Sequence, residues 1–392
     1  MAMIPFDDAY SIVSAHTLDL GVEPLSIQHC VGRILAQDVT ADIDFPPFDK
    51  SAMDGYACRA ADLSAPLDVL ETIAAGTPPS KPVGAGQCSK IMTGAQVPEG
   101  ADCVFMVEQA EGLDEGRVRY TGTKVPDNIC RQGEDVQAGD VVLESGTRID
   151  PAQVAVLAGV GCVVPIVAKQ PKVGVLVTGS ELVSPTRKPS AAQIRETNGY
   201  QLRAQLDTLG IACSYYGVIE DDEEKIETAL LQAMGENDVV LVCGGSSVGD
   251  FDFVPVLFQK HCAEMLFEKV DIKPGKPVMF ATHPGGVVFG MPGNPVSTYV
   301  LMELLVKPYL VQSMGLAAAP RIVPLKLNKD LKVRCVRRQT FIPVRLVGGG
   351  VERVEFHGSA HIHAMCHADG LVTLPAGENF HEAGSRIDVR LL

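Results

Sequence analysis

The sequence lacks long hydrophobic runs, an excess of positive charge and paired cysteines. Its longest apolar run, Val154–Ala168, is broken by glycines and a proline and is shorter than the ~20 residues that a membrane-spanning helix needs. The formal net charge of −15 argues against general nucleic-acid binding and against docking on anionic membranes. We therefore expect neither nucleic acid nor a membrane as a partner.

The cysteines also exclude a disulfide framework. There are 11 of them, an odd number, scattered along the chain without any C-x-x-C pair. This pattern indicates reduced, mostly buried thiols. The first residues contain neither the basic nor the apolar segment of a signal peptide, so a cytoplasmic location is expected.

The composition is that of a globular protein, with 46% hydrophobic and 21% charged residues. A chain of 392 residues is expected to divide into two to four domains. Three segments near its centre, residues 243–252, 273–277 and 290–297, combine Gly, Pro and small hydroxyls with lysines. Sharp turns with exposed N–H groups and nearby cations predict a pocket for a phosphorylated or oxyanionic substrate.

The rhythm of the sequence changes along the chain. Residues 46–138 are dense in turn residues between short strands, which predicts an inserted β-rich domain. Residues 169–318 alternate strands with helices, which indicates a doubly wound α/β domain whose ligands lie at the carboxyl ends of the strands. Residues 319–392 return to strands, with a hairpin at three consecutive glycines. Residues 1–45 and 139–168 are assigned to an N-terminal linker domain.

Local signals place several elements. The runs Val173–Val177 and Asp238–Cys243 are continuous and apolar, as in strands buried on both faces of a parallel sheet. Asp150 followed by Pro151 predicts the start of a helix, with the aspartate as N-cap. Another helix is expected over Pro295–Val311, following one of the Gly/Pro segments.

Seven ordered segments carry a resemblance to a known family. They are Phe48–Ala57, Ile91–Ala95 with Val97–Gly100, Arg131–Asp135, Thr178–Leu182, Gly244–Gly249, Ile272–Pro277 and Met291–Ser297. Together they resemble the molybdopterin molybdenumtransferase family, whose relatives include the C-terminal domain of gephyrin. The resemblance implies a multidomain α/β plus β fold with a molybdopterin-binding-like α/β domain and a C-terminal β-barrel-like domain. It also implies a homodimer, in which the linker domain serves dimerisation.

The activity that the resemblance implies is insertion of molybdenum from molybdate into adenylylated molybdopterin, with release of AMP and involvement of Mg²⁺. A molybdopterin adenylyltransferase is the expected substrate donor. The residue types suit this chemistry, because a carboxylate-held metal neutralises phosphate charge. Lys, Arg and hydroxyl groups suit the tetrahedral molybdate dianion.

The resemblance implies catalytic roles for Asp54, Thr93 and Asp135, although Asp54-Gly alone is typical of a turn. These three lie outside the α/β domain, so they could contribute only if the β-rich domain packs against it. The resemblance implies that the partner subunit supplies that domain to the site.

The implied catalytic residues in the α/β domain are Glu181, Asp221 and Asp252, with Asp252 and Glu181 as metal ligands. Asp221 has an alternative role as a helix N-cap. Ser180 stands where many family members carry Asp, which leaves a ligand role at that position open.

Substrate or molybdate contacts are expected from seven further residues. They are Lys269, Lys273, Lys276, Asn294, Ser297, Arg338 and Ser359. Among the lysines, Lys273 and Lys276 rank above Lys269, because a Pro-Gly-Lys-Pro frame directs them. The tail histidines His357, His361, His363 and His367, with Cys366, are either a transition-metal site or solvent-facing residues.

Two other functions stay open at this point. The shared α/β domain is also that of enzymes that adenylylate molybdopterin, and a non-catalytic scaffold related to gephyrin is a third reading. The sequence does not distinguish molybdate from tungstate, since both are tetrahedral dianions of similar size.

Overall fold

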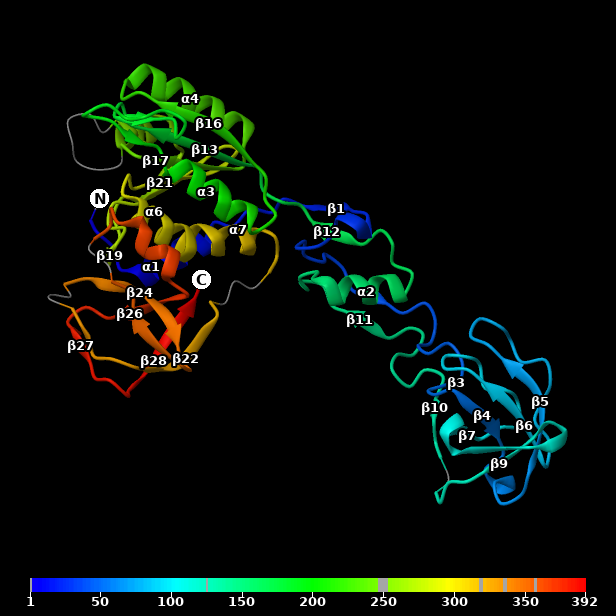
Figure 1. Ribbon diagram of the computed structural model, residues 1–392. Coiled ribbons are helices and arrows are strands. Elements are labelled where there is room, and N and C mark those ends of the chain that lie inside the picture. The colour runs from blue at the N-terminus through cyan, green and yellow to red at the C-terminus, as the bar shows by residue number, and fades with distance from the viewer. Residues whose placement is uncertain (1, 125, 246–252, 317–319, 334–336, 356–357) are drawn as a thin grey trace.

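A six-stranded sheet with helices on both faces forms the largest part of the computed structural model, which describes residues 2–124, 126–245, 253–316, 320–333, 337–355 and 358–392 (Figure 1). Its strands are β13 (Val173–Thr178), β16 (Cys213–Ile219), β17 (Val239–Cys243), β18 (Glu264–Phe267), β20 (Met279–His283) and β21 (Gly286–Met291). They lie in the order β16-β13-β17-β21-β20-β18. The first four are parallel, whereas β20 and β18 are antiparallel to their neighbours.

The helices cover the sheet because its central strands are apolar on both faces. Every residue of β13 and β17 is buried, and successive side chains point to opposite faces. The helices are α1 (Phe6–Ala15), α3 (Asn198–Asp207), α4 (Glu223–Glu236), α5 (Val254–His261), α6 (Pro295–Leu301) and α7 (Lys307–Ser313). Val175 and Leu241 pack in the core beneath α1, α3, α6 and α7, while Leu176 and Val240 pack beneath α4 and α5. The predicted doubly wound architecture is confirmed.

Two details of this unit differ from the sequence expectation. The helix predicted over Pro295–Val311 consists of α6 and α7 joined by a buried π-helical segment, η5 (Met302–Val306). The first helix, α1, contributes Phe6, Ala9 and Val13 to the core of the α/β unit. It therefore packs with this unit in space, although the boundary of the linker domain at residue 45 stays a prediction.

The C-terminal strands close into a barrel. β24 pairs with both β25 and β26, and β22 and β28 complete the ring between them. The strands are β22 (Ile322–Leu327), β24 (Gln339–Val347), β25 (Gly350–Arg353), β26 (Gly370–Leu374) and β28 (Arg386–Leu391), accompanied by β23 (Leu331–Lys332), β27 (Phe380–His381) and the 3₁₀ helix η6 (Ile362–His367). The hairpin at the three glycines joins β24 to β25, as predicted.

A short strand couples the barrel to the α/β unit. β19 (Ile272–Lys273) follows β18 in the chain but pairs in parallel with β24 of the barrel. The two units therefore share backbone hydrogen bonds and lie side by side in Figure 1. This junction brings residues from both units towards the same edge of the large sheet.

The inserted part is rich in β-structure, as predicted. Its main sheet has the order β7-β4-β6-β5-β9-β8, and β3 pairs with β10. The strands are β3 (Lys50–Ser51), β4 (Gly55–Cys58), β5 (Leu67–Ile73), β6 (Gln87–Ile91), β7 (Cys103–Met106), β8 (Ala110–Leu113), β9 (Arg117–Tyr120) and β10 (Ile129–Cys130). Two buried clusters of its own, one around Ile91 and one around Phe105, form its core.

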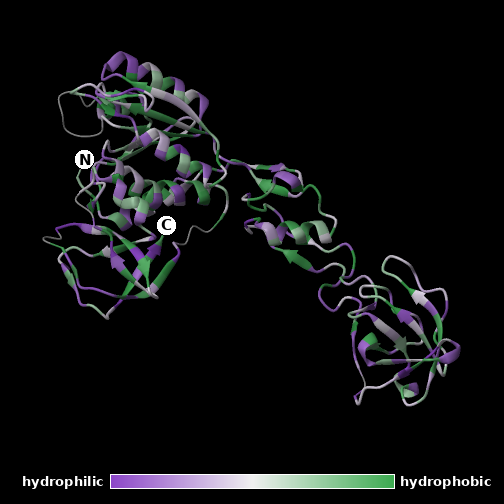
Figure 2. Cartoon of the chain, in the orientation of Figure 1, coloured by the Kyte–Doolittle hydropathy of each residue, from purple (hydrophilic) through white to green (hydrophobic). Residues whose placement is uncertain are grey.

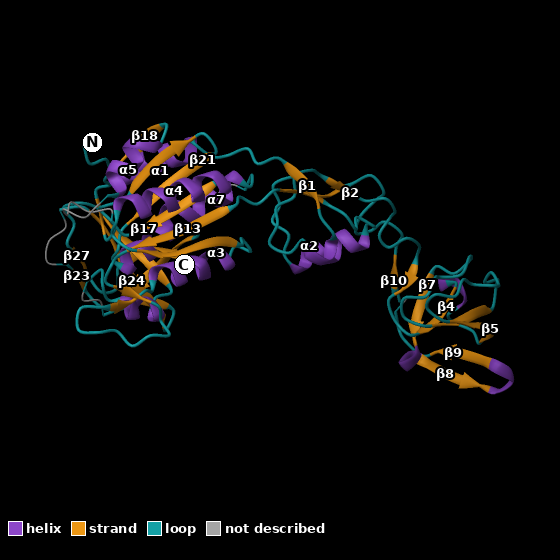
Figure 3. Ribbon diagram, turned by 90° about the horizontal axis from the view of Figure 1, so that it is seen from above, coloured by secondary structure: helices purple, strands orange, loops and turns teal. Residues whose placement is uncertain are grey.

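A slender middle unit connects the inserted part to the rest. It contains β1 (Val22–Pro24), β2 (Val39–Thr40), β11 (Val141–Leu143), α2 (Pro151–Gly159) and β12 (Ile166–Ala168). α2 begins with the predicted Asp150 cap, which forms a capping box with Gln153. Seen from two directions, the β-rich unit lies at the end of the molecule away from the large sheet (Figures 1 and 3).

Each unit has its own core, and every unit in Figure 2 contains both hydrophobic and hydrophilic residues. Among the described residues, no helix has the length and apolar composition required to span a bilayer.

Candidate active site

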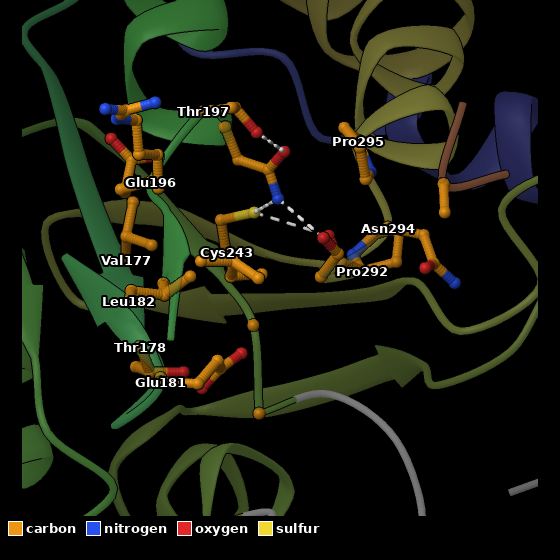
Figure 4. A pocket seen from close by; sticks show the side chains of 18 of the residues that line it. Val177, Thr178, Glu181, Leu182, Glu196, Thr197, Cys243, Pro292, Asn294 and Pro295 are labelled. Carbon is orange, nitrogen blue, oxygen red and sulfur yellow. Dashed lines mark hydrogen bonds between the residues drawn. The ribbon is translucent and has the colours of Figure 1, made fainter. Parts of the chain in front are cut away.

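A cavity of about 640 Å³ opens where β13, β17 and β21 end. We call it the sheet-end cavity. Figure 4 shows Thr178 and Glu181 at one end of it, Asn294 at the other, and Cys243 between them. The carboxyl edge of a doubly wound sheet is where such folds bind ligands, so this position agrees with the prediction from the strand pattern.

Carboxylates dominate the charges on the described walls of the sheet-end cavity. Glu181 follows β13, Asp221 follows β16, and Glu196 precedes α3, whereas Arg195 is the one cation among the described lining residues. A phosphorylated ligand in such a cavity requires an additional positive charge. Mg²⁺ commonly binds through one or two carboxylates, several waters and substrate phosphates. Glu181 and Asp221 suit that donor set.

Asp221 is free of the capping role that its sequence position suggested. The N-cap of α4 is the next residue, Asp222, whose side chain accepts a hydrogen bond from the Lys225 N–H. Asp221 instead contacts the loop after β13: its Oδ2 accepts from the Ser180 N–H at 2.8 Å, and its own N–H donates to Ser180 Oγ at 2.9 Å. Its carboxylate is thereby held at the cavity.

Hydrogen bonds in the cavity lining join the start of α3 to the end of β17 and to the loop after β21. Asn198 Nδ2 donates to the Gly293 carbonyl at 2.8 Å and lies 3.2 Å from Cys243 Sγ. Burial raises the pKa of the Cys243 thiol to about 12, so it stays protonated. Gly244 is tightly confined, because a Cβ there would lie 2.4 Å from the Thr178 carbonyl oxygen and its φ is +101°. Only glycine lets the chain turn this close to the end of β13.

Sequence reasoning missed Glu196, Asn198 and Thr178 as cavity residues. Glu196 is 2% exposed and accepts hydrogen bonds from the Gly199 N–H and from the Tyr215 hydroxyl. The available signal was the run of polar residues 195–198, at the point where α3 begins.

The predicted residues at the start of α6 have different positions. Asn294 lines the cavity, and it is the N-cap of α6 but its side chain makes no capping hydrogen bond. Ser297 lies within α6, is 3% exposed and does not line the cavity. Of these two residues, Asn294 lines the sheet-end cavity and Ser297 does not.

None of the predicted basic residues is among the described residues that line the sheet-end cavity. Lys273 and Lys276 are exposed, and Pro277, the residue after Lys276, lines the cavity. Arg338 Nη1 donates to the Ile272 carbonyl at 3.0 Å, which places it next to Lys273. Lys269 is half-buried, and its carbonyl accepts from the Ile4 N–H.

Ser359 belongs to the same neighbourhood. Its carbonyl accepts a hydrogen bond from the Val296 N–H, and the following residue, Ala360, lines the cavity. The barrel and the α/β unit thus both contribute predicted contact residues near the start of α6.

Asp54 and Thr93 are brought together, but far from the sheet-end cavity. The Thr93 N–H and hydroxyl both donate to Asp54 Oδ1 at 2.7 Å. These two hydrogen bonds hold the pKa of Asp54 below its ordinary value, and the one from the backbone has the larger effect. Asp135 also lies towards that end, where its N–H donates to the Phe45 carbonyl. Within one chain the β-rich unit is remote from the large sheet (Figure 1).

Two earlier expectations concern metals. Asp252 lies outside the described residues, as does His357, so the proposed metal role of Asp252 stays a prediction. His361, His363 and His367 line a second cavity of about 660 Å³ on the barrel. Within the described residues, however, no group of three or more His, Cys, Asp or Glu side chains is arranged to hold a metal ion.

Three family models cover most of the chain. The MoeA N-terminal region (domain I and II) matches residues 4–161, a probable molybdopterin-binding domain matches residues 174–312, and the MoeA C-terminal region (domain IV) matches residues 332–392.

Curated relatives and solved structures agree with these matches. The molybdopterin molybdenumtransferase of Staphylococcus epidermidis RP62A is 35% identical over 378 residues, covering 94% of this chain and 90% of the relative. That of Staphylococcus aureus Mu50 is 34% identical over 399 residues, covering 99% and 95%. The crystal structure of the molybdopterin biosynthesis moeA protein from Pyrococcus horikoshii OT3 has a TM-score of 0.85 at 29% identity, with both chains fully covered. The chain therefore belongs to the MoeA family of molybdopterin molybdenumtransferases, transferases of molybdenum cofactor biosynthesis.

Proposed function

We propose that this chain inserts molybdenum from molybdate into adenylylated molybdopterin and releases AMP. The observation that carries the proposal is the sheet-end cavity, where Glu181 and Asp221 face a space at the carboxyl ends of β13, β17 and β21. A cavity of about 640 Å³ is in the range that encloses a small organic ligand. The carboxylates among its described lining residues suit a phosphoanhydride that binds together with a divalent cation.

Each group of residues has a part in this reaction. Glu181 and Asp221, with Asp252 as a third proposed carboxylate, would hold Mg²⁺, which when bound neutralises charge on the phosphoanhydride. Asn294 orients the ligand from the opposite end of the cavity. The Asn198–Gly293 hydrogen bond joins the start of α3 to the loop that carries Asn294.

Molybdate is proposed to bind beside the cavity, at the junction of the α/β unit with the barrel. Lys273 and Arg338 are neighbours there through the Arg338–Ile272 hydrogen bond, and Lys276 precedes a lining residue. Ser359 accepts the hydrogen bond from the Val296 N–H, and Ser297 is the residue after Val296. Cations and hydroxyls of this kind complement a tetrahedral dianion.

The functional unit is proposed to be a homodimer. Asp54, Thr93 and Asp135 do not approach the sheet-end cavity of their own chain, so a second copy has to supply them. Large apolar side chains are exposed on the middle unit, including Val31 and Val163, both 59% exposed, and Val22, 55% exposed. Exposed apolar surface of this kind is typical of an association face.

A reconstituted reaction tests the proposal. The purified chain is incubated with adenylylated molybdopterin, molybdate and Mg²⁺, and AMP and protein-bound molybdenum are measured together. We expect molybdate-dependent AMP release that Glu181→Gln abolishes. Formation of adenylylated molybdopterin from ATP and molybdopterin alone would instead identify an adenylyltransferase. Absence of both reactions would favour a scaffold.

The proposal also assigns a source of substrate. A molybdopterin adenylyltransferase is expected to deliver the adenylylated intermediate, because the reaction consumes the product of that enzyme class.

A further inference from the structure

We propose that Ser180 is a positioning residue, which holds the Asp221 carboxylate in the orientation that the sheet-end cavity requires. The inference rests on the proposed function, since it concerns a residue of the same cavity. Ser180 itself does not line the cavity, whereas its neighbours Gly179 and Glu181 do. It therefore acts through Asp221 and not on the ligand.

Three hydrogen bonds join the loop after β13 to the end of the adjacent strand β16 and to the loop that follows it. The Gly179 N–H donates to the Ile219 carbonyl at 3.1 Å. One step further along, Ser180 and Asp221 exchange the two hydrogen bonds of 2.8 and 2.9 Å described above. The last two form a reciprocal pair, in which each residue is both donor and acceptor. We call this pair the Ser180–Asp221 clip.

The clip occupies one carboxylate oxygen and leaves the other available. Oδ2 of Asp221 accepts from the Ser180 N–H, while within the described residues Oδ1 has no hydrogen bond from the protein. An aspartate that caps a helix would instead turn its carboxylate towards the helix backbone. Asp222 takes that task for α4, so Asp221 remains directed by the clip.

A serine hydroxyl serves this position because it accepts a hydrogen bond without adding charge. Three carboxylates and one guanidinium already line the described walls. A further carboxylate within hydrogen-bonding distance of Asp221 would disfavour the charged form of both groups. An alanine would remove the acceptor of the Asp221 N–H and leave only the backbone half of the clip.

The test compares Ser180→Ala and Ser180→Thr with Ser184→Ala. Ser184 is a matched control, because it lies in the same connection between β13 and α3 but its hydroxyl contacts Thr186 and not the cavity. One readout is the Kd for AMP in the presence of Mg²⁺, measured by isothermal titration calorimetry. The other is the steady-state rate of AMP release, with separate KM values for adenylylated molybdopterin and molybdate.

Ser180→Ala is expected to weaken AMP binding and lower kcat/KM for adenylylated molybdopterin by about fivefold each, the effect of one neutral hydrogen bond. The KM for molybdate should not change, because molybdate is proposed to bind at the barrel junction. Ser180→Thr should recover both values, and Ser184→Ala should match the wild type. Wild-type values for Ser180→Ala in both readouts would overturn the inference.

A double-mutant cycle with Asp221→Ala makes the test independent of any general loss of stability. If Ser180 acts through Asp221, Ser180→Ala has no further effect on AMP binding once Asp221 is removed. Additive effects would overturn the inference. Failure of the proposed function would look different: the wild type would release no AMP from adenylylated molybdopterin, whereas the titrations with AMP and Mg²⁺ would still report on the clip.

Discussion

At the scale of single residues, hydrogen bonds decide which task each carboxylate performs. Asp221 and Asp222 are adjacent in sequence, yet one lies at the sheet-end cavity and the other caps α4. Asp54 is exposed, but two hydrogen bonds from Thr93 stabilise its charged form. The same residue type therefore caps a helix at one position and lines a cavity at another.

Replacing Thr93 with valine is expected to raise the pKa of Asp54. The variant keeps the Thr93 backbone hydrogen bond but loses the one from the hydroxyl, which favours the ionised carboxylate. Because the ionised form is then lost at a higher pH, the acid limb of the activity profile should move upward. Carboxyl carbon NMR of Asp54 measures the shift directly. Thr121→Val is the control, since that hydroxyl donates only to a carbonyl in the same unit. An unchanged Asp54 titration would contradict this account.

Removing Lys273 or Lys276 should weaken molybdate binding more than removing Lys269. Loss of one direct cation from a dianion is expected to cost ~1.5–3 kcal/mol, or about one to two decades in affinity. Lys269 is half-buried, and its backbone pairs with the N-terminal segment, so Lys269→Ala should matter less. Molybdate titrations at low and high ionic strength distinguish direct contact from a general field, which salt screens. Equal, salt-sensitive losses in all three variants would exclude the proposed molybdate position.

At the scale of secondary-structure elements, the cavity depends on how strands end. β13 and β17 stop at the same edge of the sheet, and Gly244 turns the chain directly over the last residue of β13. The loops after β13, β16 and β21 are then joined by the Ser180–Asp221 clip and by the Asn198–Gly293 hydrogen bond. Short-range geometry at these ends sets the shape of the site.

Gly244→Ala is expected to destabilise the α/β unit by about 1–3 kcal/mol, because the added methyl meets the Thr178 carbonyl and the backbone has a positive φ. Gly235→Ala is the control, for which we expect the opposite effect on stability. Gly235 lies exposed in α4 with open space around it, so alanine should stabilise the helix by up to about 1 kcal/mol. Urea unfolding followed by circular dichroism measures both, since the chain has no tryptophan. A neutral Gly244→Ala would show that the turn tolerates a side chain.

At the scale of the whole molecule, the elongated shape separates residues that the reaction is proposed to use together. The β-rich unit with Asp54 and Thr93 lies beyond the middle unit, away from the large sheet (Figure 1). No rearrangement of side chains bridges that separation. A symmetric dimer does so, if the β-rich unit of one copy reaches the sheet-end cavity of the other.

Heterodimers with one defect in each subunit test this arrangement. Asp54→Asn and Glu181→Gln chains, co-expressed with different tags, should each be inactive as homodimers. The purified heterodimer should recover about half of the wild-type activity, because one of its two composite sites is intact. The control heterodimer pairs Asp54→Asn with Asp135→Asn, which leaves both composite sites damaged. No recovery in the first heterodimer would show that the site is built within one chain or does not need Asp54.

The sequence by itself determined the local architecture. Continuous apolar runs predicted β13 and β17, Asp150 with Pro151 predicted the start of α2, and three glycines predicted the β24–β25 hairpin. These succeed because burial on both faces, capping and turn geometry depend on neighbouring residues. The ordered motifs also indicated the family to which the chain belongs.

Only the tertiary structure decided which side chains share a space. Glu181, Glu196, Asp221 and Asn294 line one cavity, although more than 100 positions separate the first from the last. It also showed that Asp222 is the cap and that the predicted lysines are not among the described lining residues of the cavity. Asp54 and Thr93 are 39 residues apart and meet through two hydrogen bonds. Contacts of this kind depend on how whole strands and loops pack, which local patterns do not encode.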